Sequence, residues 1–177
     1  MAGFRLTLPT LHRVTPLPTL QALEPFFSTF DKDYLPLRER MSKVLQREAD
    51  LEEIVQLVGK DSLGEVDKVV LDVASIIKED FLAQNAFSDY DYYCPLNKTI
   101  GMMRCIVTFF VQSINAIKES SSDAKVTMAL IMNLLRDEYN QLSVLKMEKP
   151  EQPKEELDKK FQNLINSIEK KFRSISK

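Results

Sequence analysis

The stretch that decides the fold is LRERMSKVLQREADLEEIVQLVG, residues 37–59. Its apolar side chains recur every three or four residues, a spacing that places them on one face of a helix. This stripe consists of Leu37, Met41, Val44, Leu45, Leu51, Ile54, Val55 and Val58. Asp31 or Asp33 suits the start of the helix as a cap, Pro36 suits its first turn, and Gly59 is a natural stop. We therefore expect one long amphipathic helix with this stripe toward the core.

The helical period continues toward the C-terminus. Further helices are expected at about 64–83, from Thr99 to about 118, at 126–145 and at 157–175. QNAFSDYDYYCPLNK (84–98) interrupts the period and predicts an ordered loop, ESSSD (119–123) predicts a turn, and KMEKPEQPK (146–154) predicts a linker. The last helix has the cleanest amphipathic pattern, so it requires a partner for its apolar face.

These segments predict an all-α fold, a bundle of five or six helices. We divide the chain into an irregular leader over 1–22, a helical domain over 23–146, and a linker with a C-terminal amphipathic helix over 147–177. The leader is rich in proline and threonine and has no acidic residue. It is either a flexible segment without a targeting role or an organelle transit segment, and composition favours the first.

Composition excludes several classes of function. The chain has 177 residues, a net charge of −2, four glycines, one histidine and two cysteines. The near-neutral balance argues against a nucleic-acid-binding surface, and scarce glycine argues against glycine-rich phosphate loops. One histidine rules out a multi-histidine metal site, and no apolar run reaches the ~18 to 20 residues of a membrane span. We expect no metal site, no nucleic-acid partner and no direct membrane insertion.

Few residues suggest chemistry on their own. GKDSLG (59–64) matches the first part of a phosphate loop, but the lysine and hydroxyl residue that must follow are missing. Cys94 has no histidine nearby, so a structural thiol is favoured over a reactive one. The aromatic residues of the loop either form a wall for a planar ligand or anchor the loop on the bundle. They are Phe87, Tyr90, Tyr92 and Tyr93. No catalytic residue is identified.

Several longer blocks carry a family resemblance. They are VLQREADLEEIVQLVGKDSL (44–63), KEDFLAQNAF (78–87), YCP (93–95), KT (98–99), MMR (102–104) and, upstream, ALEPFF (22–27). In this order they resemble the C-terminal helical domain of the catalytic A subunit of V-type and archaeal-type rotary ATPases. The similarity runs from about Leu20 to the C-terminus and is strongest between Val44 and Arg104.

The resemblance implies roles for three places. Phe87 corresponds to an aromatic residue that packs on the adenine of bound nucleotide. The turn bearing Asp61, Leu63, Glu65 and Asp67 corresponds to the loop that bears on the central stalk, with acidic groups and Leu63 as an apolar tip. The alternative is an ordinary turn, with Leu63 packed in the bundle. Cys94 corresponds to a cysteine proposed to pair with one in the phosphate loop, a partner that this sequence lacks.

The resemblance also sets expectations for function. The family's phosphate loop and catalytic glutamate lie in a nucleotide domain that this sequence does not contain. We therefore expect no cofactor and no hydrolysis for the isolated chain, and ATP with Mg²⁺ only in the complete family protein. Expected partners are the central stalk and the B subunit. The expected location is cytoplasmic, on the cytosolic face of an acidified compartment, with mitochondrial import as the weaker alternative.

Three interpretations of the chain remain open. It is a truncated, non-catalytic paralogue or splice product that acts through subunit or rotor contacts, or the C-terminal piece of a full ATPase subunit separated from its nucleotide domain. The third possibility is a helical scaffold repurposed away from the ATPase.

Overall fold

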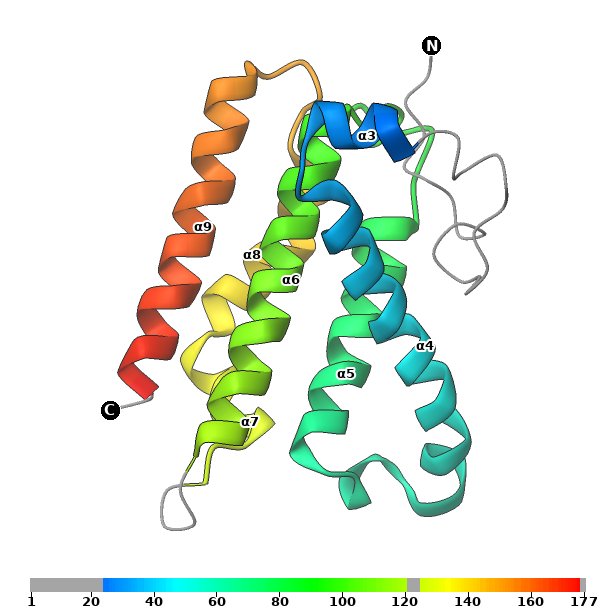
Figure 1. The fold of residues 1–177 in the computed structure, drawn as a ribbon, viewed down its shortest axis with the longest axis vertical. Helices are drawn as coiled ribbons and strands as arrows, with labels where there is room; N and C mark the ends of the chain where they lie inside the picture. Colours follow the sequence, from blue (N-terminus) through cyan, green and yellow to red (C-terminus); the bar gives the residue numbers. More distant parts are fainter. Residues whose placement is uncertain (1–23, 121–124, 176–177) are drawn as a thin grey trace.

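The computed structural model describes residues 24–120 and 125–175, and its regular elements there are all helical. The helices are α3 (Glu24–Phe30), α4 (Tyr34–Val58), η1 (Lys60–Ser62), α5 (Glu65–Ser75), η2 (Ile76–Leu82), α6 (Leu96–Glu119), α7 (Met128–Leu134), α8 (Arg136–Val144), η3 (Leu145–Met147) and α9 (Lys154–Ile175) (Figure 1). The predicted all-α class is confirmed. The predicted leader, residues 1–22, lies outside the described residues.

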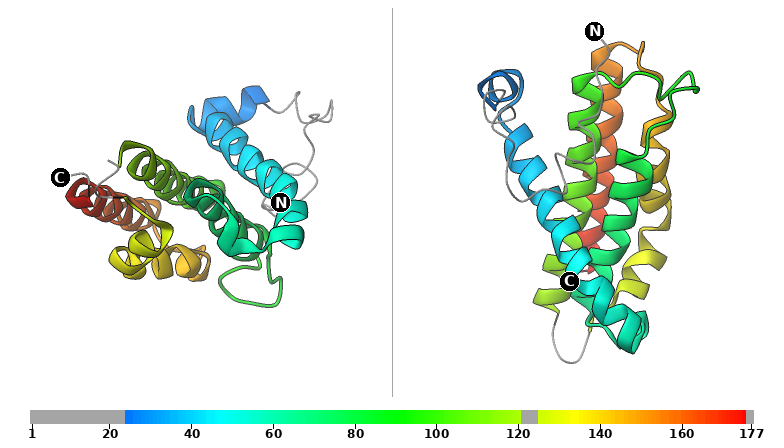
Figure 2. Two further views of the ribbon diagram at one scale, coloured as in Figure 1. Left: turned by 90° about the horizontal axis from the view of Figure 1, so that it is seen from below. Right: turned by 90° about the vertical axis from the view of Figure 1, so that its right-hand side faces the viewer.

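Helix α6 is the centre of the bundle. The α4–α5 hairpin lies on one side of it and α9 on the other, while α7 and α8 cover a third side, as Figure 2 shows from two directions. Among the described residues, α6 is long and apolar enough to cross a membrane by length and composition alone. Its neighbours explain this composition, since α4, α5, α8 and α9 all pack against it.

The turn between α4 and α5 and the segment between η2 and α6 lie at opposite ends of the bundle. Helix α4 descends to η1 at the lower end in Figure 1, and α5 followed by η2 leads back toward the upper end. The segment between η2 and α6, residues 83–95, crosses that upper end on the side of the bundle away from α3, as the two views of Figure 2 show. We call this segment the aromatic loop.

Helix α9 packs closely on α6. A Cβ atom on Gly101 of α6 would lie 2.1 Å from Cδ2 of Phe161 on α9. Leu157, Phe161, Leu164, Ile168 and Phe172 are all buried, so the apolar stripe predicted for the last helix is occupied by the bundle itself. The close approach explains why the smallest residue stands in the middle of a helix, where glycine is otherwise unfavourable.

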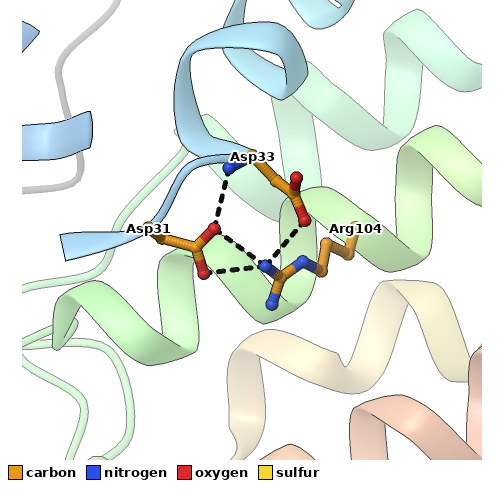
Figure 3. A network of polar contacts seen from close by, with 3 residues as sticks. All are labelled: Asp31, Asp33 and Arg104. Carbon is orange, nitrogen blue, oxygen red and sulfur yellow. Dashed lines mark hydrogen bonds and ion pairs between the residues drawn. The ribbon is translucent and has the colours of Figure 1, made fainter. Parts of the chain in front are cut away.

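An arginine fixes the junction of α3 and α4 to α6 (Figure 3). Arg104 Nη2 donates to both carboxylate oxygens of Asp31, at 2.8 and 2.7 Å, and to Asp33 Oδ2 at 3.0 Å. Asp31 Oδ1 also accepts the backbone N–H of Asp33. Asp33 is the N-cap of α4, but its side chain makes no capping hydrogen bond. The side-chain capping expected from the sequence is therefore replaced by a tertiary ion pair.

Three predicted segments differ in detail. The helix expected over 64–83 changes to π-helical hydrogen bonding from Ile76 onward. The helix expected over 126–145 is broken at Leu135, which has φ −107° and ψ 21°. Helix α6 begins at Leu96 with Pro95 as its N-cap, and Thr99 donates to the Pro95 carbonyl instead of capping the helix.

The predicted stripe of α4 is only partly buried. Leu37, Met41, Val44, Leu45 and Leu51 lie in the core. Ile54 and Val58 are exposed, and Val55 is half-buried. The last two turns of α4 extend past the packed part of the bundle, which is why the helical period continues there without burial.

Candidate functional site

The turn between α4 and α5 is set by its first residue. Gly59 has φ +81°, a conformation that side chains disfavour, and it allows the chain to leave α4 sharply. The backbone N–H of Gly59 donates to the Val55 carbonyl at 2.9 Å, and Leu63 N–H donates to the Lys60 carbonyl at 3.2 Å. No strand precedes this turn among the described residues, so GKDSLG does not have the surroundings of a phosphate loop.

The turn does not present Leu63 to solvent. Leu63 is only 8% exposed and belongs to the hydrophobic core. Of the two interpretations of Leu63, its burial agrees with packing in the bundle, because the 3₁₀ turn of η1 directs the chain back toward α5 and buries the next side chain. The stalk contact expected for this turn stays a prediction. Asp61, by contrast, is exposed.

Two of the predicted acidic groups are engaged inside the chain. Glu65 accepts from Lys68 Nζ at 2.8 Å and from the backbone N–H of Met128 at 2.6 Å, so it joins α5 to the start of α7. The hydrogen bond from Lys68 lowers the pKa of Glu65. Asp67 pairs with Arg47 on α4 at 3.1 Å. These two carboxylates therefore stabilise the hairpin, and Asp61 is the predicted acidic residue that faces solvent.

The exposed apolar surface at this end belongs to α4. Leu57 is 84% exposed, Val58 54% and Ile54 42%. Together with Asp61 they form what we call the α4-end surface. Sequence reasoning assigned Ile54 and Val58 to the core because their spacing continues the buried stripe. The contrary signal in the sequence is the row of acidic and polar residues around them, Glu52, Glu53 and Gln56, which leaves little apolar surface for a covering helix.

The aromatic loop is built around a buried carboxylate. Asp91 is 1% exposed, and its Oδ2 accepts the backbone N–H of Asn85 at 2.8 Å. Gln84 Nε2 donates to the Asp91 carbonyl at 2.7 Å. These hydrogen bonds join the first part of the loop to Asp91, up to seven positions later in the chain. The π-helix η2 leads directly into the loop. π-helical turns are frequent at functional sites, where they re-aim the chain that follows.

Phe87 lies at the tip of this loop and is fully exposed, at 100%. Its backbone N–H donates to Asn85 Oδ1 at 3.0 Å, which fixes the turn and leaves the ring open to solvent. Tyr92 is half-exposed and donates from its hydroxyl to Glu151 at 2.8 Å. Of the two interpretations of the loop aromatics, anchoring describes Tyr92, whereas Phe87 has an open ring face for a planar ligand.

Both cysteines are buried free thiols. Cys94 is 2% exposed, and its sulfur lies 3.3 Å from Thr99 Oγ1. Cys105 lies in the core near the Phe161 carbonyl, and burial raises the pKa of its thiol to about 12. A buried thiol has little access to oxidants. The redox role suggested by resemblance for Cys94 stays a prediction.

No residues that would hold a metal ion are found in 24–120 and 125–175: no three or more His, Cys, Asp or Glu side chains converge there. The candidate functional features are two surfaces. One is the α4-end surface at the lower end of the bundle, and the other is the exposed ring of Phe87 at the upper end.

Comparison with known proteins finds a matching family and named relatives. Residues 23–126 match the family described as the C-terminal domain of V and A type ATP synthase. The chain is 48% identical over 136 residues to the catalytic A subunit of the V-type proton ATPase from Trypanosoma congolense, covering 77% of this chain and 22% of that protein.

Two further relatives carry the same name. The Dictyostelium discoideum protein is 41% identical over 157 residues, covering 89% of this chain and 25% of that protein. The Arabidopsis thaliana protein is 42% identical over 156 residues, covering 87% and 25%. The chain thus spans about a quarter of the length of the relatives it matches. The match over residues 23–126 shows that this chain belongs to the family of C-terminal domains of V and A type ATP synthases.

Proposed function

We propose that this chain acts as a non-catalytic helical module of a V-type proton ATPase, making contacts with the other proteins of the assembly. The observation that carries the proposal is the α4-end surface, where three large apolar side chains are exposed beside Asp61 and no helix of the described residues covers them. Burying one such side chain stabilises a complex by roughly 1.5 to 3 kcal/mol. An exposed ion pair contributes only about 0 to 1 kcal/mol.

The contact partner at this end is the central stalk of the rotary ATPase, and the B subunit is the expected lateral neighbour. Leu57 is the centre of the contact because it is the most exposed of the three apolar residues. Leu63, the apolar residue expected there from the resemblance, supports the turn from inside. Asp61 lies at the rim and makes the association sensitive to salt.

Binding of the purified chain to the stalk and the B subunit of a V-type ATPase tests the proposal. The variant Leu57→Ser removes an exposed apolar group, and Leu130→Ser on α7 is the matched control, since Leu130 is also exposed, at 39%. We expect Leu57→Ser to weaken stalk binding at least about tenfold while its melting temperature stays near that of the parent. Equal binding by both variants would refute the α4-end surface as the contact.

Phe87 supports a second, weaker role at the edge of a nucleotide site. Stacking of one aromatic ring on a base contributes about 1 to 3 kcal/mol, which gives millimolar or poorer affinity once association entropy is counted. Phosphoryl transfer also requires phosphate and Mg²⁺ ligands and a group that positions water. We therefore propose that this chain alone does not hydrolyse ATP and that ATP and Mg²⁺ belong to the complete family protein. Micromolar binding in calorimetry, or Mg-ATP turnover abolished by a point mutation in this chain, would contradict that.

The same proposal places the chain on the cytosolic face of the membrane that the ATPase serves, as a peripheral component of the assembly. The packing of α6 inside the bundle supports this, because its apolar side chains already have partners. Fractionation tests it: we expect carbonate washing to release the chain from membranes. Retention in the washed membrane pellet would argue for insertion.

A further inference from the structure

One charged side chain of α6 lies entirely inside the protein. Lys98, in the first turn of α6, is 0% exposed. Its Nζ donates to three backbone carbonyls, those of Tyr90 at 2.9 Å, Lys146 at 2.6 Å and Glu148 at 2.6 Å. Burial of an ammonium group is costly unless its donors are satisfied, so this arrangement requires all three carbonyls in place at once.

The three carbonyls come from two segments that are distant in sequence. Tyr90 belongs to the aromatic loop, whereas Lys146 and Glu148 belong to residues 145–153, which lead from α8 into α9 and which we call the α8–α9 joint. Lys98 itself stands at the start of the helix on which α9 docks, three residues before Gly101. One ammonium group thus connects the loop, the joint and the central helix.

Contacts nearer the surface also hold the joint, one from the aromatic loop and the others to η2. The Tyr92 hydroxyl donates to Glu151 of the joint at 2.8 Å. Lys146 Nζ donates to the Glu79 carbonyl of η2 at 2.9 Å and lies 3.6 Å from Asp80. These exposed contacts are weak individually. The Lys98 ammonium differs from these contacts because it is buried, so water does not compete for its hydrogen bonds.

We propose that Lys98 is a positioning residue that couples the aromatic loop to the α8–α9 joint, so that docking of α9 on α6 fixes the place of Phe87. A lysine suits this role because its three ammonium donors point in different directions and reach three separate carbonyls. Arginine's planar guanidinium matches flat, paired acceptors better. Loss of the ammonium leaves three partly buried carbonyls without this donor, which favours opening of both segments together.

The test compares Lys98→Met with Lys118→Met in nucleotide-free protein. Methionine keeps an unbranched chain but donates no hydrogen bond, and Lys118 is an exposed lysine in the last turn of the same helix. We expect Lys98→Met to accelerate amide hydrogen exchange roughly tenfold or more in two places. These are the loop amides of Asp91 and Tyr92, which donate to Ser88, and the Glu148 amide in the joint. Exchange in α4 and α5 should remain near the parent's, and Lys118→Met should change none of these rates.

A fluorescent reporter gives a second readout. The chain contains no tryptophan, so Phe87→Trp introduces a single one at the tip of the loop. Adding Lys98→Met to this variant should lower the fluorescence anisotropy of Trp emission, because the loop gains freedom. Exchange that rises in the loop but not in the joint would overturn the coupling. An equal rise throughout α4, α5 and both segments would reduce Lys98 to a residue of general stability and would also overturn it.

Failure of Lys98→Met to fold leaves a decisive measurement on the parent. Native-state exchange in sub-denaturing urea should then show the loop and joint amides opening with equal urea dependence and with protection factors within about threefold of each other. Clearly different opening of the two segments would refute the proposal. The significance of Phe87's position rests on the proposed function, but these readouts use neither nucleotide nor partner, so either claim can fail without the other.

Discussion

Replacing Gly101 by alanine should destabilise the protein, although alanine is the better helix former. The added Cβ would lie 2.1, 2.3 and 2.8 Å from three ring atoms of Phe161. Carbon atoms in contact normally lie about 3.5 to 4.0 Å apart, so the ring or the helix must move by roughly 1.4 Å. Phe161 is 3% exposed and has little room to turn away.

The magnitude follows from two opposing effects. Overpacking of a well-filled core costs typically ~1 to 3 kcal/mol, and an approach of 2.1 Å belongs in the upper part of that range, at about 2 to 3 kcal/mol. Replacing glycine by alanine inside a helix contributes about 0.8 to 1 kcal/mol in the opposite direction. We expect Gly101→Ala to lower the free energy of unfolding by about 1 to 2 kcal/mol, which lowers the melting temperature of a chain of this size by roughly 2 to 8 °C.

Urea unfolding followed by circular dichroism at 222 nm measures this change. Gly64→Ala is the matched control, because its nearest neighbour would be Asp67 Oδ2 at 3.9 Å and its φ is an ordinary −61°. Its effect should stay within about 0.5 kcal/mol. A Gly101→Ala protein as stable as the parent would refute the close packing of α9 on α6.

A double-mutant cycle identifies the clash as the cause. Phe161→Ala alone should cost about 3 to 5 kcal/mol, because a buried ring is removed. With Gly101→Ala already present, the same change should cost about 1 to 3 kcal/mol less, since the ring that clashes is gone. Strictly additive effects would show that the two side chains do not interact.

Leu63→Ala should lower the free energy of unfolding by about 2 to 4 kcal/mol because Leu63 is a core residue. Leu57→Ala, at the exposed end of α4, should change it by less than about 0.5 kcal/mol. Equal melting temperatures of the two variants would place Leu63 outside the core. Burial raises the pKa of Glu138, but hydrogen bonds from Lys171 and Ser167 outweigh this and leave it below its ordinary value of 4.5. Because a lowered folded-state pKa contributes stability above pH 4.5 that is lost as the pH falls through it, Glu138→Gln should flatten the acid limb of stability against pH. An unchanged acid limb, measured by urea titrations between about pH 3 and pH 7, would contradict this.

The sequence by itself determined the fold class and most helix positions. The spacing of apolar residues at a period of 3.6 is a property of each segment alone. It therefore predicts the helices over Leu37 to Leu51 and Leu157 to Phe172 whatever they pack against. Gly59 likewise marks the end of α4 because few other residues adopt its positive φ. The family was equally visible, since several blocks occur together in order.

The tertiary structure decided which apolar residues face solvent. Ile54 and Val58 fit the helical pattern yet are exposed, whereas Leu63 lies in the turn that follows and is buried. Periodicity gives the direction of a side chain around its own helix but not how far the neighbouring helix extends. The exposed apolar surface at this end of the bundle therefore depends on how far α4 extends beyond its packed part, which the tertiary structure decides.

Polar partners between distant segments were also beyond the sequence. Arg104 meets Asp31 across 73 positions, and Lys98 meets the Glu148 carbonyl across 50. Such pairs leave no local pattern, because either residue alone is compatible with a solvated helix face. A buried lysine finds its partners only through the way the chain folds around it. Every residue carries a backbone carbonyl, so the sequence does not indicate which carbonyls will converge on one point.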